Sequence, residues 1–331
     1  MKIALYVLWL AGFGLFVALI GAQGVGDVAG AIAAAGWGLA LVVAWHFAPM
    51  LADTIAWRVL LPRPHRRRVG PLLWMRWVCE SINTLLPVAQ VGGDLVRARL
   101  LYRAGVPGPM AGASIVVDLT TAVLMQIAFA LLGVGLLLFH GGTTDAAVGM
   151  SIGIAVFGLL VLGFYLAQRA GMFLALARVF ERMAGDGDWL SLVGSAARLD
   201  QSVRRLYRRR RPFAIACAWR FLAWSLGAGE VWLALHFLGH PVTLLEALML
   251  ESLGNAVRGA AFAVPGALGV QEGGFILLGS QVGLDAETSL ALSLVKRFRE
   301  LVFGLPGLLV WQATLGHHLW RRKRGPSEST C

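Results

Sequence analysis

The pattern of hydrophobic residues along the chain predicts a helical protein that crosses a membrane several times. An apolar run of about twenty residues is long enough to span the roughly 30 Å of hydrocarbon in a bilayer. Six such runs predict full transmembrane helices, over residues 3–22, 37–60, 110–139, 148–168, 213–238 and 289–316. Two further apolar regions, about 72–104 and 244–283, are each broken by a proline, and we expect them to be re-entrant hairpins.

The two broken regions share one spacing, which predicts an internal repeat. Each copy has a proline, an acidic residue, a glycine and one charge in the following apolar helix, at intervals of seven, eighteen and thirty-one residues from the proline. The landmarks of the first copy are Pro87, Asp94, Gly105 and Asp118. Those of the second copy are Pro265, Glu272, Gly283 and Lys296. Broken hydrophobic segments at matching places in two halves point to the binding site of a transporter.

The positions of Arg and Lys predict an orientation. Loops rich in basic residues are 58–68, 97–103, 169–211 and 321–324, and they alternate with loops that contain neither Lys nor Arg, at 21–36, 140–147, 239–246 and 284–288. The basic loops of a membrane protein face the cytoplasm. Both termini are then cytoplasmic, and the two repeats, about 37–139 and 213–316, run in opposite directions through the membrane as inverted repeats.

Composition supports one integral membrane domain over residues 1–324, followed by a short disordered tail at 325–331. Hydrophobic residues make up 58% of the chain, charged residues 14%, and the mean hydropathy is +0.71. Soluble domains have roughly 25% charged residues. The net charge of +11 comes from the basic loops, so we expect no nucleic-acid partner. Within 170–211, apolar residues recur at helical spacing beside arginines, which predicts an amphipathic cytoplasmic linker lying on the inner leaflet.

Neither the cysteines nor any other reactive side chains suggest catalysis. Cys79, Cys217 and Cys331 are odd in number and scattered along the chain, which argues against disulfides and a metal site. No grouping of a nucleophile with an acid or a base stands out. We therefore expect a protein that is not an enzyme and that needs no cofactor or metal.

Charged residues within the apolar regions are the candidates for function, because a charge at mid-bilayer costs at least about 2.5 kcal/mol and usually faces a cavity or a partner. They are Asp53, Glu80, Asp94, Asp118, Glu230, Glu251, Arg258, Glu272, Lys296, Arg297, Arg299 and Glu300. So many such groups predict a polar interior cavity.

Asp94 and Glu272 are the sharpest pair, because each follows a proline break and adjoins two glycines. The residues expected to keep the hairpins broken are Pro87, Gly92, Gly93, Pro265, Gly273 and Gly274. In one interpretation the two carboxylates contact a lipid headgroup or a coupling cation at the hairpin tips. In the other, each carboxylate caps the second helix of its hairpin by accepting backbone N–H bonds. Both interpretations can hold together.

Asp118 and Lys296 occupy equivalent repeat positions with opposite charge. They form either a switchable ion pair between the repeats or separate local pairs, such as Lys296 with Glu300. The residues that open the two hairpins, Glu80 and Asn83 in the first and Glu251 and Asn255 in the second, either bond helices together or contact substrate. Arg97, Arg297 and Glu300 complete the predicted substrate or ion pathway.

Two stretches resemble one known family. ESINTLLPVAQVGGDLVR, from Glu80 to Arg97, and VPGALGVQEGG, from Val264 to Gly274, resemble the lysylphosphatidylglycerol synthase transmembrane family, and the similarity covers about residues 1–320. AGWG at 35–38 with His46 and Pro49, residues 53–61, and PVAQVGG from Pro87 resemble its subgroup associated with hopanoid biosynthesis.

The resemblance implies a bacterial inner-membrane protein with two re-entrant hairpins around a lipid-accessible cavity. Its partners would be membrane lipids, a hopanoid or a phospholipid, together with proteins of lipid biosynthesis or export. The family's multiple peptide resistance factor carries an aminoacyl-transferase domain after its membrane part. We find no such region after residue 324, so we do not expect lipid aminoacylation.

Three functions are consistent with these features. A flippase-like lipid translocase fits the broken repeats and their carboxylates, and the lack of an ATP-binding motif would make movement downhill or ion-coupled. A scaffold that gathers lipid-synthesis enzymes fits the basic segment 170–211. An intramembrane lipid-modifying enzyme would need a clustered catalytic set, which we do not find.

Overall fold

The computed structural model of the protein describes residues 36–85, 92–139, 158–159, 162–163, 165–172, 189–261 and 267–323. Within these ranges all regular structure is helical, which confirms the predicted class. The predicted span 3–22, most of the span 148–168, both break prolines, Pro87 and Pro265, and the tail at 325–331 lie outside the described residues.

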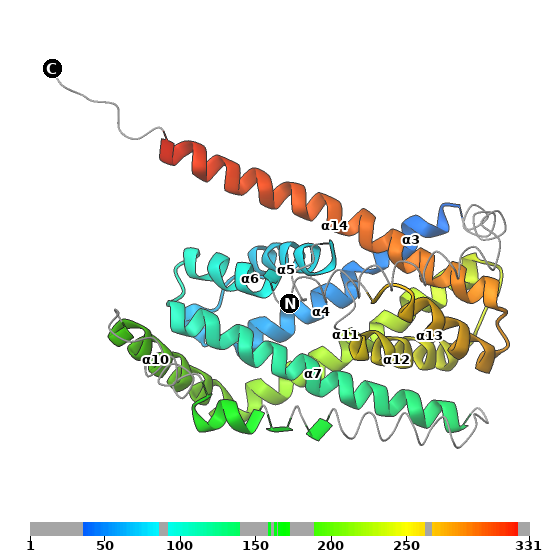
Figure 1. Ribbon diagram of the computed structural model, residues 1–331, viewed down its shortest axis with the longest axis horizontal. Coiled ribbons are helices and arrows are strands. Elements are labelled where there is room, and N and C mark those ends of the chain that lie inside the picture. The colour runs from blue at the N-terminus through cyan, green and yellow to red at the C-terminus, as the bar shows by residue number, and fades with distance from the viewer. Residues whose placement is uncertain are drawn as a thin grey trace.

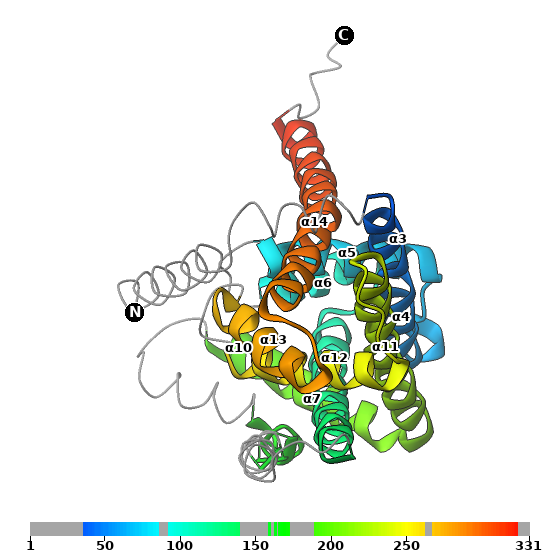
Figure 2. The same cartoon turned by 90° about the vertical axis from the view of Figure 1, so that its right-hand side faces the viewer.

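Long helices packed side by side form the molecule (Figures 1 and 2). In the first half they are α3 (Gly38–Trp45), α4 (Phe47–Leu60), α5 (Val69–Leu85), α6 (Gly92–Arg103) and α7 (Gly108–Phe139), with the short η1 (Arg63–His65). In the second half they are α10 (Trp189–Arg208), α11 (Arg210–Phe237), α12 (Leu244–Ala260), α13 (Val270–Gly279) and α14 (Ala286–Lys323), with η3 (Ser280–Val282).

Two described stretches are long and apolar enough to cross a membrane, Gly38–Leu60 and Gly108–Phe139. They agree with two of the predicted spans. The predicted spans 213–238 and 289–316 fall within α11 and α14, and both helices carry several charged residues. That these two helices also cross the membrane stays a prediction.

Helix boundaries reproduce the spacing of the two repeats. α7 begins at Gly108 and α14 at Ala286, 178 residues apart, which is also the separation of the landmark glycines Gly105 and Gly283. Both glycines have a left-handed φ, 87° and 77°, a conformation that favours glycine after a helix. In each copy a helix, a break and a second helix precede this turn. α5 packs on α6 toward the end of the molecule where α10 lies, and α12 packs on α13 toward the opposite end (Figure 1).

Buried charges lie between two apolar clusters, as the order of residues along the long helices shows. On α7, Asp118 lies between Val117 of one cluster and Val134 of the other. On α11, Arg220 and Glu230 lie between the corresponding clusters in the same way. Along α7 and α11 these ionic groups therefore form a layer at the border between the two apolar clusters.

Close helix crossings depend on small residues. A Cβ atom added at Gly307 of α14 would lie 2.1 Å from the hydroxyl oxygen of Ser81 on α5, and one added at Gly133 would lie 2.2 Å from that of Ser252. Small residues at helix interfaces let backbones approach closely. This packing fixes α5 against α14 and α12 against α7, and so fixes the helices that carry the buried charges.

α10 is the predicted amphipathic helix, and part of its apolar face packs inside the protein; that the helix also lies on the inner leaflet stays a prediction. Val203 and Leu206 are buried and pack in the apolar cluster that contains the first turns of α7. The Tyr207 hydroxyl donates to Gln168 at 2.6 Å. The N-terminal half of α7 thus covers the C-terminal part of the apolar stripe, while the side chains of Arg205 and Arg208 are exposed.

Candidate functional site

Asp118 is the centre of the first ionic network. Its carboxylate pairs with three guanidinium groups, those of Arg76 on α5 at 2.8 Å, Arg97 on α6 at 2.8 Å and Arg220 on α11 at 2.5 Å. The Asp118 side chain is 1% exposed. A buried carboxylate needs such partners, because the loss of hydration is repaid only by close, well-directed ion pairs.

Two further carboxylates balance these arginines. Asp53 of α4 lies 2.6 Å from Arg220 and 3.5 Å from Arg76. Asp94 accepts from Arg97 at 2.8 Å. The first network therefore contains three carboxylates and three guanidinium groups drawn from α4, α5, α6, α7 and α11, and it carries no net charge.

The break of the first hairpin is bridged by Asn83 at the end of α5. Its side-chain oxygen accepts from the backbone N–H of Gly93 at 2.8 Å, and its amide donates to Asp94 at 3.2 Å. A Cβ atom at Gly93 would lie 2.2 Å from the carbonyl oxygen of Cys79. Asn83 thus accepts the N–H of Gly93 at this helix start, and Asp94 pairs with Arg97. The residue three before Asp94, whose N–H the carboxylate would cap, lies outside the described residues, so the capping interpretation for Asp94 stays a prediction.

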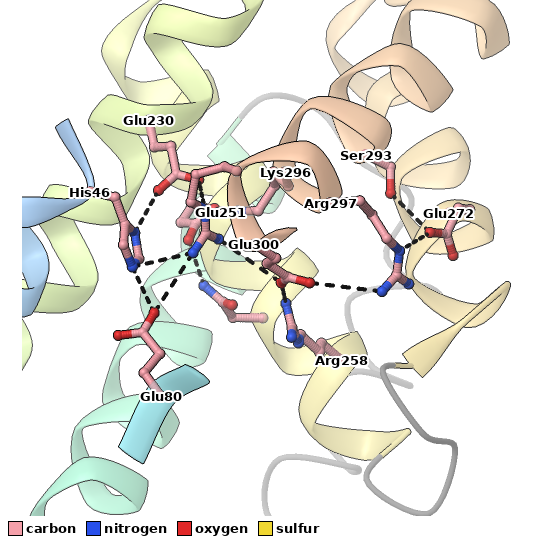
Figure 3. Close-up of polar contacts among 12 residues, drawn as sticks. His46, Glu80, Glu230, Glu251, Arg258, Glu272, Ser293, Lys296, Arg297 and Glu300 are labelled. Atoms are coloured by element: carbon pink, nitrogen blue, oxygen red, sulfur yellow. Dashed lines mark hydrogen bonds and ion pairs between the residues drawn. The ribbon is translucent and has the colours of Figure 1, made fainter. Parts of the chain in front are cut away.

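In the second hairpin, Glu272 both caps and pairs. One carboxylate oxygen accepts from the backbone N–H of Gly269 at 2.7 Å, at the start of α13. The other accepts from Arg297 at 2.8 Å and from the Ser293 hydroxyl at 3.3 Å, both on α14 (Figure 3). The capping interpretation is thus confirmed for Glu272. Whether this carboxylate also contacts a lipid or a cation stays a prediction.

Lys296 pairs with neither of the partners that we considered. Its ammonium lies 2.5 Å from Glu251 of α12, which also accepts from Asn255 at 2.8 Å. Glu300 pairs instead with Arg258 (Figure 3). The Asp118 carboxylate forms ion pairs with arginines of α5, α6 and α11. In this structure Lys296 therefore forms neither the Asp118 pair nor the Glu300 pair, because α12 packs close enough to α14 to supply Glu251.

A second network joins the two repeats at His46, between α3 and α4. The Nε2 atom of His46 lies 2.7 Å from Glu80 of α5, and its Nδ1 atom lies 3.2 Å from Glu230 of α11 (Figure 3). Arg299 of α14 donates to Glu230 at 2.8 Å and lies 3.2 Å from Nε2. The ring of Phe303 packs edge-on against the imidazole at 4.8 Å. We refer to His46, Glu80, Glu230 and Arg299 as the His46 node.

The structure thus distributes the predicted pathway residues over two groups. Asn83, Asp94, Arg97 and Asp118 belong to the first network, and Glu80, Glu251, Asn255, Glu272, Lys296, Arg297 and Glu300 lie in the second half or at its border. Side-chain bonds between helices dominate at Glu80, Asn83 and Glu251, and they support the packing interpretation for these three. The Asn255 side chain donates to Glu251 within α12, while its backbone carbonyl accepts from Gln126 of α7.

Sequence reasoning missed Arg76 and Arg220 and gave His46 no chemical role. Each of the two arginines lies within an apolar stretch next to aromatic residues, WMRW and AWRF. A charge in such a stretch indicates a buried partner. The same criterion that selected Asp118 would therefore have selected both arginines that pair with it.

Comparison with known proteins agrees with a membrane protein. A family model described as the lysylphosphatidylglycerol synthase TM region matches residues 4–307. A UPF0104 membrane protein of Pyrococcus horikoshii is 25% identical over 241 residues, which cover 69% of this chain and 71% of that protein.

Proposed function

This chain belongs to the family of the lysylphosphatidylglycerol synthase transmembrane region, which implies a membrane location and a lipid-related function, and on this basis we propose that it is a flippase-like lipid translocase. The cargo class is an amphiphile with a polar head, a hopanoid or a polar-headed phospholipid. The membrane is the bacterial inner membrane, crossed several times with both termini in the cytoplasm. The role is transport rather than catalysis, and it requires no cofactor.

One observation carries the proposal: a layer of buried ionic groups lies between two helix–break–helix units. Charges are expensive inside a bilayer and are usually kept there for function. The carboxylates of Asp94 and Glu272 follow the two breaks and are held by Arg97 and Arg297. A polar headgroup passing between the repeats would exchange these ion pairs for its own charges, while its chains stay in the lipid.

Inverted repeats would let the layer of ionic groups open to either leaflet in turn. In related architectures two repeats rock against each other around a fixed central site. The α5–α6 and α12–α13 units lie toward opposite ends of the molecule (Figure 1). This arrangement favours alternating exposure of the ionic layer to the two leaflets, with one hairpin opening at each side.

Leaflet exchange in proteoliposomes tests the proposal. We expect purified wild-type protein to move fluorescent phospholipid or hopanoid analogues between leaflets, and an Asp94→Asn/Glu272→Gln double variant to lose most of that rate. Glu287→Gln, which removes a carboxylate in the first turn of α14, is the matched control and should keep it. Thermal unfolding of each variant excludes misfolding. No exchange by the wild type with any of the lipids would contradict the proposal.

A scaffold for lipid-synthesis or lipid-export proteins is the second candidate, and the exposed arginines of α10 favour it. Arg205 and Arg208 face outward while the opposite face of the helix is packed on α7. Such a basic surface attracts acidic partners or anionic lipid. Replacing both arginines by glutamine should abolish co-purification of partner proteins if this role holds. Unaltered leaflet exchange in the same variant would show that the two roles are separate.

A further inference from the structure

The His46 node connects elements of both repeats. His46 and Glu80 come from the first repeat, while Glu230 and Arg299 come from α11 and α14 of the second. A change in the node therefore alters a link between the parts that must move against each other in the proposed translocation.

One nitrogen of His46 faces two incompatible neighbours. Nε2 lies 2.7 Å from a Glu80 carboxylate oxygen, which only accepts hydrogen bonds when ionised, and 3.2 Å from an Arg299 nitrogen, which only donates. With a proton on Nε2, His46 donates to Glu80. Without that proton, the Nε2 lone pair accepts from Arg299 and opposes the Glu80 oxygen. Nδ1 faces Glu230 and donates in both states.

Charge balance in the node also depends on this proton. Glu80, Glu230 and Arg299 together leave one uncompensated negative charge, whereas an imidazolium at His46 makes the node neutral. Burial disfavours an uncompensated charge. Arg76 and Lys296 act on the two carboxylates from further away, and both are already paired with other carboxylates.

Glu80 is the member of the node that a proton can reach most readily. The Glu80 side chain is 32% exposed, whereas those of His46 and Glu230 are 12% and 4% exposed. A proton that reaches Glu80 can pass along the short hydrogen bond to Nε2. The transfer breaks the O–H bond of protonated Glu80, restores its carboxylate and forms an N–H bond from the Nε2 lone pair, and nothing is oxidised or reduced.

From this geometry we infer that a proton is the ion coupled to transport and that the His46–Glu80 pair binds it. The inference rests on the proposed translocation. With the proton bound, His46 donates a hydrogen bond to Glu80, and this bond links α5 to the junction between α3 and α4. After its release, the Arg299 nitrogen that lies 3.8 Å from Glu80 is the remaining donor, and α5 is tied to α14 instead. Protonation thus decides whether Glu80 bonds to His46 of its own repeat or to Arg299 of the other.

Imidazole NMR tests proton binding independently of transport. The chain contains seven histidines, and in protein labelled with ¹⁵N-histidine the signal absent from His46→Gln identifies His46. We expect both of its nitrogens to be protonated at pH 7, and a Glu80→Gln variant to show one protonated nitrogen at that pH. A His46 signal with one proton at pH 7 and still at pH 5 in the wild type would overturn the inference.

A pH gradient tests coupling. In proteoliposomes a gradient of one pH unit should shift the steady-state ratio of labelled lipid between leaflets by up to about tenfold, if one proton moves with each lipid. We expect this shift to vanish in His46→Gln and to persist in His236→Gln, a histidine that stacks on Trp232 away from the node.

The outcomes separate the two proposals. Leaflet exchange that ignores the gradient in the wild type would retain a translocase and overturn proton coupling. No exchange at all would contradict the proposed function. In that case a doubly protonated His46 that responds to Glu80→Gln would still establish the proton site.

Discussion

Asp118 shows how strongly a single residue depends on its partners here. Its carboxylate is shared by Arg76, Arg97 and Arg220, whereas Asp53 pairs with two of these arginines and is 26% exposed. Removal of one partner from a buried ion pair typically costs about 3–5 kcal/mol, because the remaining charges stay buried and uncompensated.

We therefore expect Asp118→Asn to lower the unfolding temperature well below that of Asp53→Asn. Asp53 is the matched control because it contacts Arg76 and Arg220 from a more exposed position. Thermal unfolding of both variants in the same detergent measures the difference. Equal losses for the two variants would mean that Asp118 is no more central to the network than Asp53.

We expect replacement by alanine to have opposite effects on stability at Gly93 and at Gly273. Gly93→Ala would place a methyl group 2.2 Å from the Cys79 carbonyl oxygen, which belongs to helix backbone that cannot move aside cheaply. We expect a loss of at least about 1–3 kcal/mol in the free energy of unfolding. At Gly273 no heavy atom lies within 4 Å of the added Cβ. Gly273→Ala should be neutral, or stabilising by up to about 1 kcal/mol, because alanine favours the helix.

Among the elements, α14 begins with a side-chain cap. Asp285 accepts from the backbone N–H of Thr288 at 2.7 Å, and this bond lowers the pKa of its carboxyl below the usual range. Since the folded pKa is below the unfolded one, the stabilisation is complete above the ordinary Asp pKa of about 3.9 and is lost as the pH falls through the folded pKa.

Asp285→Ala should accordingly cost about 1 kcal/mol at neutral pH, a typical value for a lost cap. The difference between wild type and variant should shrink as the pH is lowered below about 4, because protonation removes the acceptor charge from the wild type as well. Glu287→Gln removes a charge in the same turn without removing this bond, and is the control. Unfolding followed from pH 7 to pH 3 measures both effects.

The helices were largely predictable from the sequence, because their limits follow from local signals. The landmark glycines Gly105 and Gly283 mark turns before two long helices, and the apolar runs set the lengths of α4 and α7. The surroundings of α10 were not predictable. Its stripe of apolar residues has the same period whether lipid or α7 covers it, and only tertiary packing decides between the two.

At the scale of the whole molecule, the orientation in the membrane is the property that most needs a test. The basic loops predict that α10 faces the cytoplasm and that the loop before α12 faces outward. In a cysteine-free background, Pro241→Cys should react with a membrane-impermeant maleimide in intact cells. Arg205→Cys should react only after the cells are opened. Both positions are exposed in the structure, so an inverted labelling pattern would contradict the predicted topology.

The pairing of charges is a property of the whole molecule, which is why the sequence did not reveal it. The candidates were found as isolated charges in apolar runs, and most of them are buried in ionic networks. Their partners lie far away in the chain. Asp118 is 102 residues from Arg220, and Glu230 is 184 residues from His46. Repeat symmetry suggested that Asp118 meets Lys296, but the helices beside each copy differ and supply different partners.

The three arginines around Asp118 also impose an order on biogenesis. The ribosome synthesises α4 to α7 before α11, and at that stage three carboxylates face only Arg76 and Arg97. The charge that completes the set, Arg220, arrives more than a hundred residues after Asp118. Chains begin to fold from the N-terminal side during synthesis. The first network therefore lacks one positive charge, that of Arg220, until α11 has been synthesised. α11 also supplies Glu230, which bonds to His46. The interval before α11 inserts is therefore when we expect this protein to depend most on the insertion machinery.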